Sequence, residues 1–210
     1  MAGTLGEMKL IKSLKAIPLL VVLMFTMLPI SATATESRDY MADIITALSV
    51  GDVTKAQSLN ADRNAKIDRL GLDNPKISID DLWLVGKIMN LEAGNCPYDE
   101  CAWGVGEVVL NRAASPEWDM PDTIEEVLKM PGQYYYPSLA GMFERGLPSE
   151  RCLRLALRLL EGERHLEPDV IFHCNFPLGS SIHSSYKHAG HSRLYFGRSF
   201  NPRLYEGEAQ

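Results

Sequence analysis

The segment spanning residues 80–112 constrains the fold most, because it has the pattern of two amphipathic helices joined by a sharp break. At about 100° per residue, one side of the first helix is apolar and the other is mostly polar. The apolar side has Leu82, Val85, Ile88 and Met89, with Leu84 and Leu91 at its edge, and the opposite side has Trp83, Lys87 and Asn90. Glu92 lies near the middle of the apolar side, where a carboxylate is costly to bury. Its position therefore requires an explanation.

Local signals predict where these two helices begin and end. Ser78 or Asp80 can cap the first helix, and the Gly-Asn-Cys-Pro run at 94–97 ends it. The second helix is expected from about Tyr98 to Arg112, with a buried face that consists of Cys101, Ala102, Val105, Val108 and Val109.

Farther along the chain, helix signals give way to strand signals. The expected elements are a short helix to Lys129 capped by Asp122 with Glu125, a helix to about Glu161 capped by Ser149 and ended by Gly162, and strands at 170–175 and 193–196. A loop rich in Ser, Gly and His separates the two strands. The pattern predicts a mostly helical α+β domain with a small C-terminal β-sheet.

The N-terminus has the pattern of a secretory signal peptide. A region with three lysines precedes an apolar stretch at 16–30, which is short for a membrane span. Ala-Thr-Ala at 32–34 then gives a cleavage pattern. We expect residues 1–34 to be a signal peptide that is cleaved, or else an uncleaved anchor. In either case the remaining chain would be secreted or act in the cell envelope, without stable membrane insertion after cleavage.

The remainder divides into a leader and a main domain. Residues 35–79 are expected to form two small helices, ended near Gly51 and Gly71, or a partly mobile linker. Residues 80–204 are expected to form the catalytic domain. Removal of residues 1–34 takes away three Lys and one Glu and changes the formal net charge from −6 to −8. An acidic chain lacks the basic surface of a nucleic-acid-binding protein. We expect a monomer that needs no organic cofactor.

The four cysteines, Cys96, Cys101, Cys152 and Cys174, have no fixed pairing in the sequence. Export permits disulfides. Cys96 and Cys101 are near enough to close a small loop, and Cys152 could meet Cys174, but three pairings are possible. Buried free thiols are an equally acceptable interpretation.

Glu92 has a structural and a functional interpretation. It can be a buried acid paired with Arg112 or another base, or its helix can be rotated toward solvent. Alternatively, an apolar wall raises its pKa, so that the carboxyl keeps a proton near neutral pH. A protonated carboxyl can then donate to the leaving oxygen of a glycosidic bond. Gln133, Tyr134 and Tyr135 follow in a loop whose tyrosine rings offer flat faces to sugars.

Three stretches of the chain resemble the SleB-type cell wall hydrolases, the family of spore-cortex-lytic enzymes. In order, they are NLEAGNCPYD, GVGEVVLNR and PDTIEEVLKMPGQYYYP. FHCNFP and the Ala-Gly-His at 189–191 fit the family less closely. The resemblance covers roughly residues 80–200. It implies a secreted bacterial enzyme that acts on peptidoglycan glycan strands through a compact, lysozyme-like domain. It also implies that the catalytic acid, which lies in a Glu-Ala motif in this family, is Glu92.

The family often has a second acid shortly after the first, and Gly94-Asn95-Cys96 occupies that stretch here. Five other acids are candidates for its replacement. Glu100 and Glu107 are expected on the outer side of the second helix, Asp119 and Asp122 precede a helix, and Glu144 lies in a loop. One acid can nevertheless suffice. In a lytic transglycosylase it protonates the leaving oxygen and then accepts a proton from the 6-hydroxyl of the substrate, which closes a 1,6-anhydro ring.

The predicted function is therefore cleavage of the MurNAc–GlcNAc bond, of lytic transglycosylase or muramidase type, in cell wall or spore cortex lysis. Asn111 and Arg112 are expected to brace the helix end. One alternative is a zinc amidase with ligands among His173, Cys174, His183, His188 and His191, although their spacing matches no strong zinc motif. We predict no metal site. A second alternative is a non-catalytic module that binds envelope glycan.

Overall fold

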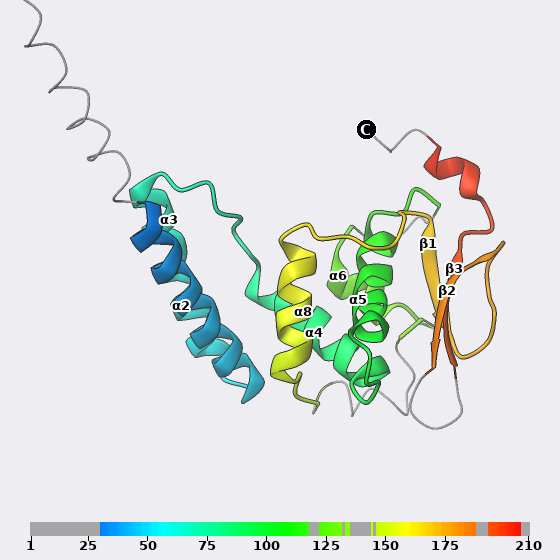
Figure 1. Ribbon diagram of the computed structural model, residues 1–210, viewed down its shortest axis with the longest axis horizontal. Coiled ribbons are helices and arrows are strands. Elements are labelled where there is room, and N and C mark those ends of the chain that lie inside the picture. Colours follow the sequence, from blue (N-terminus) through cyan, green and yellow to red (C-terminus); the bar gives the residue numbers. More distant parts are fainter. Residues whose placement is uncertain are drawn as a thin grey trace, which may run out of the picture. The chain divides into compact units, whose positions relative to one another are not determined.

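The computed structural model describes residues 30–117, 122–131, 133–134, 144, 146–187 and 193–206 (Figure 1). The chain divides into two compact units, residues 1–40 and 41–210. Of the first unit, only the beginning of helix α2 (Ile30–Ser49) is described, so most of the predicted signal segment lies outside the described residues. In the ranges given above, no helix is both long enough and apolar enough to cross a bilayer.

The second unit begins with a helical pair. After Gly51, helix α3 (Val53–Leu70) is capped by Asp52, whose side chain accepts a hydrogen bond from the Lys55 N–H. Gly71 ends α3 in the left-handed conformation, with φ of 62°, which glycine adopts without steric cost. Helices therefore end near both predicted glycines. Ile44, Leu48 and Ala56 are fully buried in the same core cluster as the residues that follow.

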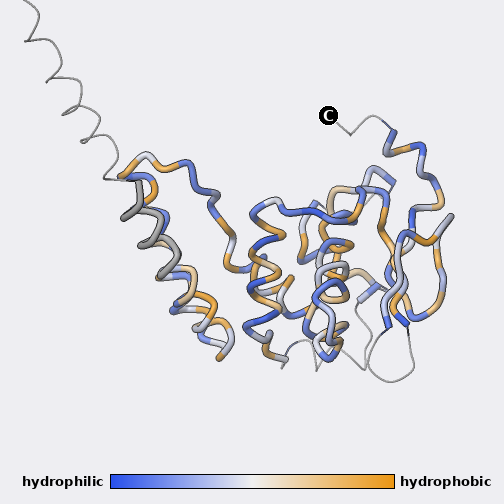
Figure 2. The backbone as a smooth tube through the Cα atoms, viewed as in Figure 1, coloured by the Kyte–Doolittle hydropathy of each residue, from blue (hydrophilic) through white to orange (hydrophobic). Residues whose placement is uncertain are grey.

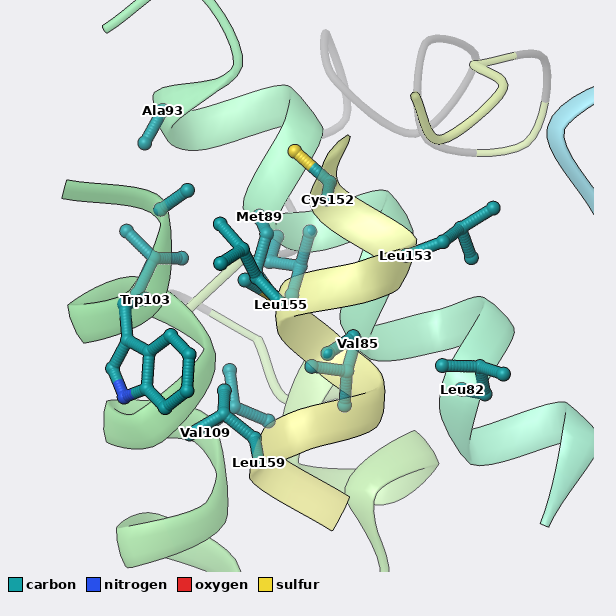
Figure 3. Packing of buried hydrophobic residues seen from close by; sticks show 14 of the residues in the cluster. Leu82, Val85, Met89, Ala93, Trp103, Val109, Cys152, Leu153, Leu155 and Leu159 are labelled. Carbon is teal, nitrogen blue, oxygen red and sulfur yellow. The ribbon is translucent and has the colours of Figure 1, made fainter. Parts of the chain in front are cut away.

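Three helices form the main core, α4 (Ile79–Ala93), α5 (Asp99–Ala113) and α8 (Glu150–Leu160), which contact one another. Their apolar side chains interlock in Figure 3. The apolar residues predicted for α4, Leu82, Val85, Ile88 and Met89, are all fully buried. Helix α8 carries hydrophilic and hydrophobic residues on different sides, as the hydropathy colouring indicates (Figure 2). The 3.6-residue periodicity therefore identified the core helices.

Side-chain caps set most of the helix starts. Ser78 accepts a hydrogen bond from the Asp81 N–H, and Ser149 accepts one from the Cys152 N–H, as predicted. The cap predicted for α6 (Ile124–Lys129) is wrong by one residue. Thr123 caps this helix through the Glu126 N–H, and its hydroxyl also bonds the Glu126 carboxylate. Thr123 and Glu126 therefore replace the expected Asp122–Glu125 pair.

The sheet has three antiparallel strands, β1 (Val170–Cys174), β2 (Ile182–Lys187) and β3 (Arg193–Arg198), in the order β1-β3-β2. The sequence predicted only two strands, because β2 lies in the polar stretch that was interpreted as a loop. Its sequence, IHSSYK, has little apolar character, and the strand lies at an edge. The mostly helical α+β class is confirmed.

Helix α5 lies between the other core helices and the sheet (Figure 1). A Cβ atom at Gly104 would lie 2.4 Å from the Phe196 ring of β3, so only glycine permits this approach. At the end of α5, the Asn111 amide donates to the carbonyls of Glu167 and Val170. Arg112 Nε donates to the Ile171 carbonyl over 2.6 Å. These contacts fix the start of β1 on the helical layer.

Glu107 and Lys87 correct the predicted helix faces. Glu107 was expected on the outer side of α5 but is fully buried. Its carboxylate accepts hydrogen bonds from the Trp103 indole and from the backbone N–H groups of His165 and Leu166. Lys87 was expected on the solvent side of α4, yet it is 8% exposed, and its ammonium donates to the Glu144 carbonyl. Segments far away in the sequence cover both side chains.

Cys96 and Cys101 form a disulfide, whereas Cys152 and Cys174 are free thiols. The bond joins the turn that follows α4 to the first turn of α5. Arg151 of α8 also holds this turn, because its guanidinium donates to the Cys96 carbonyl and to the Asp99 carboxylate. The turn next to Glu92 is therefore tied both covalently and by hydrogen bonds.

Replacing Glu107 with Gln should lower the free energy of unfolding by about 2–3 kcal/mol, because the buried donors lose a charged acceptor and the amide N–H₂ faces them. Glu100→Gln is the matched control, since Glu100 lies on the same helix and is exposed. It should change stability by less than about 0.5 kcal/mol. Urea denaturation measures both values, and equal effects of the two substitutions would contradict the assignment.

Candidate functional site

Glu92 occupies the last turn of α4, one residue before its end at Ala93. The side chain is half-buried beside the fully buried Met89 and Ala93. The Glu92 carboxyl makes no hydrogen bond and no ion pair with any residue that the structure describes. Arg112, the partner considered for a structural role, directs its Nε to the Ile171 carbonyl instead. No salt bridge between described residues therefore explains why Glu92 lies on the apolar side of α4.

Burial raises the pKa of Glu92, since desolvation disfavours the carboxylate. The charge of Glu92 in turn helps to raise the pKa values of Tyr134 and Cys174, although desolvation is the larger cause for both residues. These electrostatic effects indicate that Glu92 lies near Tyr134, which follows α6, and near Cys174 at the end of β1. A carboxyl of this kind is suited to hold a proton and release it to a substrate.

Arg112, Tyr134 and His173 form a stack beside Glu92. The guanidinium carbon of Arg112 lies 5.0 Å from the centroid of the Tyr134 ring. The His173 ring stacks on Tyr134 with a centroid distance of 5.4 Å and an interplanar angle of 25°. The three side chains come from α5, from the segment after α6, and from β1. The joint between α5 and β1 therefore also assembles this stack.

The two rings of the stack are uncharged near neutral pH. Burial raises the pKa of Tyr134 to about 12, although the Arg112 charge opposes this shift. Burial, assisted by Arg112, lowers the pKa of His173 to about 3. Tyr134 thus keeps its hydroxyl proton and His173 stays a neutral imidazole.

The structure locates part of the predicted substrate loop. Tyr134 is buried, and Gln133 is half-buried in a turn in which its N–H donates to the Met130 carbonyl. Tyr135 lies outside the described residues. Arg112 and His173 join Tyr134 next to Glu92. The sequence suggested Arg112 as a brace of the helix end or as an ion-pair partner of Glu92, and His173 as a strand residue or zinc ligand. Nothing in the local sequence indicated the contact between His173 and Tyr134.

The other acids that were considered have different environments. Glu107 is occupied by three donor groups, and Glu100 and Asp122 are exposed. Glu144 is exposed and accepts from Lys87 through its backbone carbonyl. Asp119 lies outside the described residues. In the described part of the chain, no group of three or more His, Cys, Asp or Glu side chains is placed to hold a metal ion. His188 and His191 lie outside the described residues.

Residues 99–191 match the family described as Cell Wall Hydrolase, which confirms the resemblance found in the sequence. This segment, somewhat less than half of the chain, contains Arg112, Tyr134, His173 and Cys174, and it begins seven residues after Glu92. The segment is similar to this family, and the match supports a role in peptidoglycan hydrolysis. No curated protein and no solved structure matches the chain.

Replacing Glu92 with Gln should increase stability at neutral pH. A raised pKa in the folded state means that the protonated Glu92 contributes stability fully below its unfolded pKa, and this contribution is lost as pH rises through the folded pKa. As pH rises through the folded-state pKa of Glu92, the free energy of unfolding of Glu92→Gln should therefore increase relative to that of the natural protein. Urea denaturation at several pH values measures it.

The exposed Glu100→Gln is the control for the loss of a carboxylate as such. A Glu92→Gln protein that is less stable than the natural protein at neutral pH would indicate that the carboxylate is a structural partner.

Proposed function

We propose that the chain cleaves the MurNAc–GlcNAc glycosidic bond of peptidoglycan, with Glu92 as its acid and base. The observation that carries this proposal is the half-buried Glu92 carboxyl, which has a raised pKa and no bonding partner among the described residues. It lies beside residues of the segment that matches the cell wall hydrolase family. An acid with these properties meets the requirement for protonating a leaving oxygen.

In the proposed first step, protonated Glu92 donates its proton to the glycosidic oxygen as the bond from that oxygen to the anomeric carbon breaks. The oxygen leaves as a hydroxyl group, and positive charge develops on the MurNAc ring. Glu92 is then a carboxylate, which stabilises the positive ring electrostatically.

In the second step, the Glu92 carboxylate accepts the proton of the MurNAc 6-hydroxyl as that oxygen bonds to the anomeric carbon. The product is a 1,6-anhydro ring, and Glu92 is protonated again. This route needs no enzymic nucleophile, which agrees with the exposed or otherwise bonded acids among the described candidates. In the muramidase version, water replaces the 6-hydroxyl and leaves a reducing end.

Gln133, Tyr134 and Tyr135 are proposed to position the glycan. The protein is proposed to act as a secreted monomer in the cell envelope, on vegetative wall or spore cortex. The family match supports the envelope location, because its substrate lies outside the cytoplasm.

Digestion of purified sacculi, with the soluble products identified by mass spectrometry, tests the reaction. The natural protein should release fragments that end in 1,6-anhydro-MurNAc, and the release should persist in EDTA. Glu92→Gln should lower the rate by about 10²-fold or more, since the acid–base step is lost. Glu100→Gln should retain the rate.

Other products would point to other functions. Reducing MurNAc ends without anhydro sugars would establish the muramidase version. Free glycan strands separated from peptides would indicate an amidase. Binding without release of fragments by any of the proteins would identify a glycan-binding module.

The rate should also depend on pH in a defined direction. Because the first step needs protonated Glu92, the initial rate of sacculus cleavage should fall as pH rises through the raised pKa of this residue. Initial rates between pH 4 and 9 measure the profile. A rate that increases throughout this range would contradict the role of Glu92 as general acid.

A further inference from the structure

Two polar atoms in the stack beside Glu92 lack hydrogen-bond partners among the described residues. They are the hydroxyl oxygen of Tyr134 and Nδ1 of His173, and both are shielded from solvent. The Tyr134 side chain is 6% exposed. Buried polar atoms in folded proteins are nearly always bonded, and one left unbonded costs about 1–3 kcal/mol. Two such atoms occur on stacked rings next to Glu92, which makes this stack the candidate place for a ligand group.

The chemistry of the two atoms is complementary. Tyr134 keeps its proton and offers an O–H donor. Neutral His173 offers an unprotonated nitrogen at Nδ1 when its proton is on Nε2. The pair thus presents one donor and one acceptor, in rings that are 25° from parallel.

A secondary amide is the group that matches this pair. Its carbonyl oxygen accepts one hydrogen bond, its N–H donates one, and its planar shape suits a site lined by flat rings. Arg112 also holds the site in place, because it both contacts the Tyr134 ring and bonds the backbone of β1. Glu92 lies near enough for its charge to act on Tyr134. The amide would therefore be bound next to the proposed acid.

We propose that Tyr134 and His173 bind the 2-acetamido group of the amino sugar beside the scissile bond. The Tyr134 hydroxyl donates to the acetamido carbonyl, and His173 Nδ1 accepts from the acetamido N–H. Both atoms are shielded in the chain without substrate, so binding includes a displacement that exposes them. This inference rests on the proposed glycan cleavage and makes the enzyme specific for N-acetylated strands.

The test compares N-acetylated sacculi with the same sacculi after chemical removal of acetyl groups. A third sample, re-acetylated with acetic anhydride, controls for other damage. The measured quantity is the ratio of cleavage rates on acetylated and de-acetylated glycan. Tyr134→Phe and His173→Phe keep an aromatic ring but remove one polar atom each. Tyr186→Phe, at a half-buried tyrosine on β2, is the matched control.

The natural protein and Tyr186→Phe should prefer acetylated glycan and recover their rates on the re-acetylated sample. Each site variant should reduce the preference by about three- to tenfold, the effect of one net hydrogen bond. Tyr134→Phe should fold at least as stably as the natural protein, because it removes an unbonded buried hydroxyl. A merely structural role of Tyr134 would lower its melting temperature and leave the ratio unchanged.

A second measurement covers the case in which a variant does not fold. Titration of the natural protein with oligomers of N-acetylglucosamine and of glucosamine, followed by tyrosine and tryptophan fluorescence, should show binding of the acetylated oligomer only. Equal binding of both oligomers, or equal rate ratios in all folded variants, would overturn the acetamido site while leaving glycan cleavage intact. Failure of the natural protein to cleave acetylated sacculi would overturn the proposed function, and the acetamido site with it.

Discussion

The hydrogen bonds from the end of α5 to the start of β1 join the helical layer to the sheet. Asn111 and Arg112 are both almost fully buried, and they bond three backbone carbonyls between Glu167 and Ile171. Glu107, one turn earlier, bonds the backbone just before β1. A polar edge of α5 thus holds a segment more than 50 residues away. The candidate site depends on this joint, because Glu92 and Arg112 come from helices while His173 comes from the sheet.

The same joint explains why the candidate acid lacks an ion-pair partner among the described residues. Arg112 is the cation that the sequence offers to Glu92, but its Nε donates to the Ile171 carbonyl of β1 and its guanidinium carbon lies over the Tyr134 ring. The positive charge nevertheless remains nearby, where it opposes the rise in the pKa of Tyr134 and assists the fall in that of His173. The fold therefore keeps Glu92 desolvated, with no neutralising partner among the described residues. A structural acid shows the opposite arrangement, as Glu107 does with its set of donors.

The sequence predicted those parts of the fold that depend on local pattern. The apolar period of α4, the caps Ser78 and Ser149, and the unusual place of Glu92 all follow from neighbours within a few residues. Burial of Glu107 could not be predicted, because its donors are 58 and 59 residues away. Strand β2 was missed since its polar residues lie at an edge, and pairing with β3 alone orders them. The Tyr134–His173 stack likewise could not be predicted, because it joins a loop to a strand that is distant in the sequence, and periodicity describes only local structure.

The place of α4 in the core bears on where a minimal protein can begin. The family match starts at residue 99, after α4 has ended. Yet α4 supplies Leu82, Val85, Ile88, Met89 and Ala93, all without solvent exposure, to the cluster shared with α5 and α8. A fragment that starts at residue 99 would expose the facing sides of both helices and retain Cys101 without its disulfide partner. The folding unit is thus larger than the family segment, and the candidate acid belongs to the part that a trimmed chain would lose.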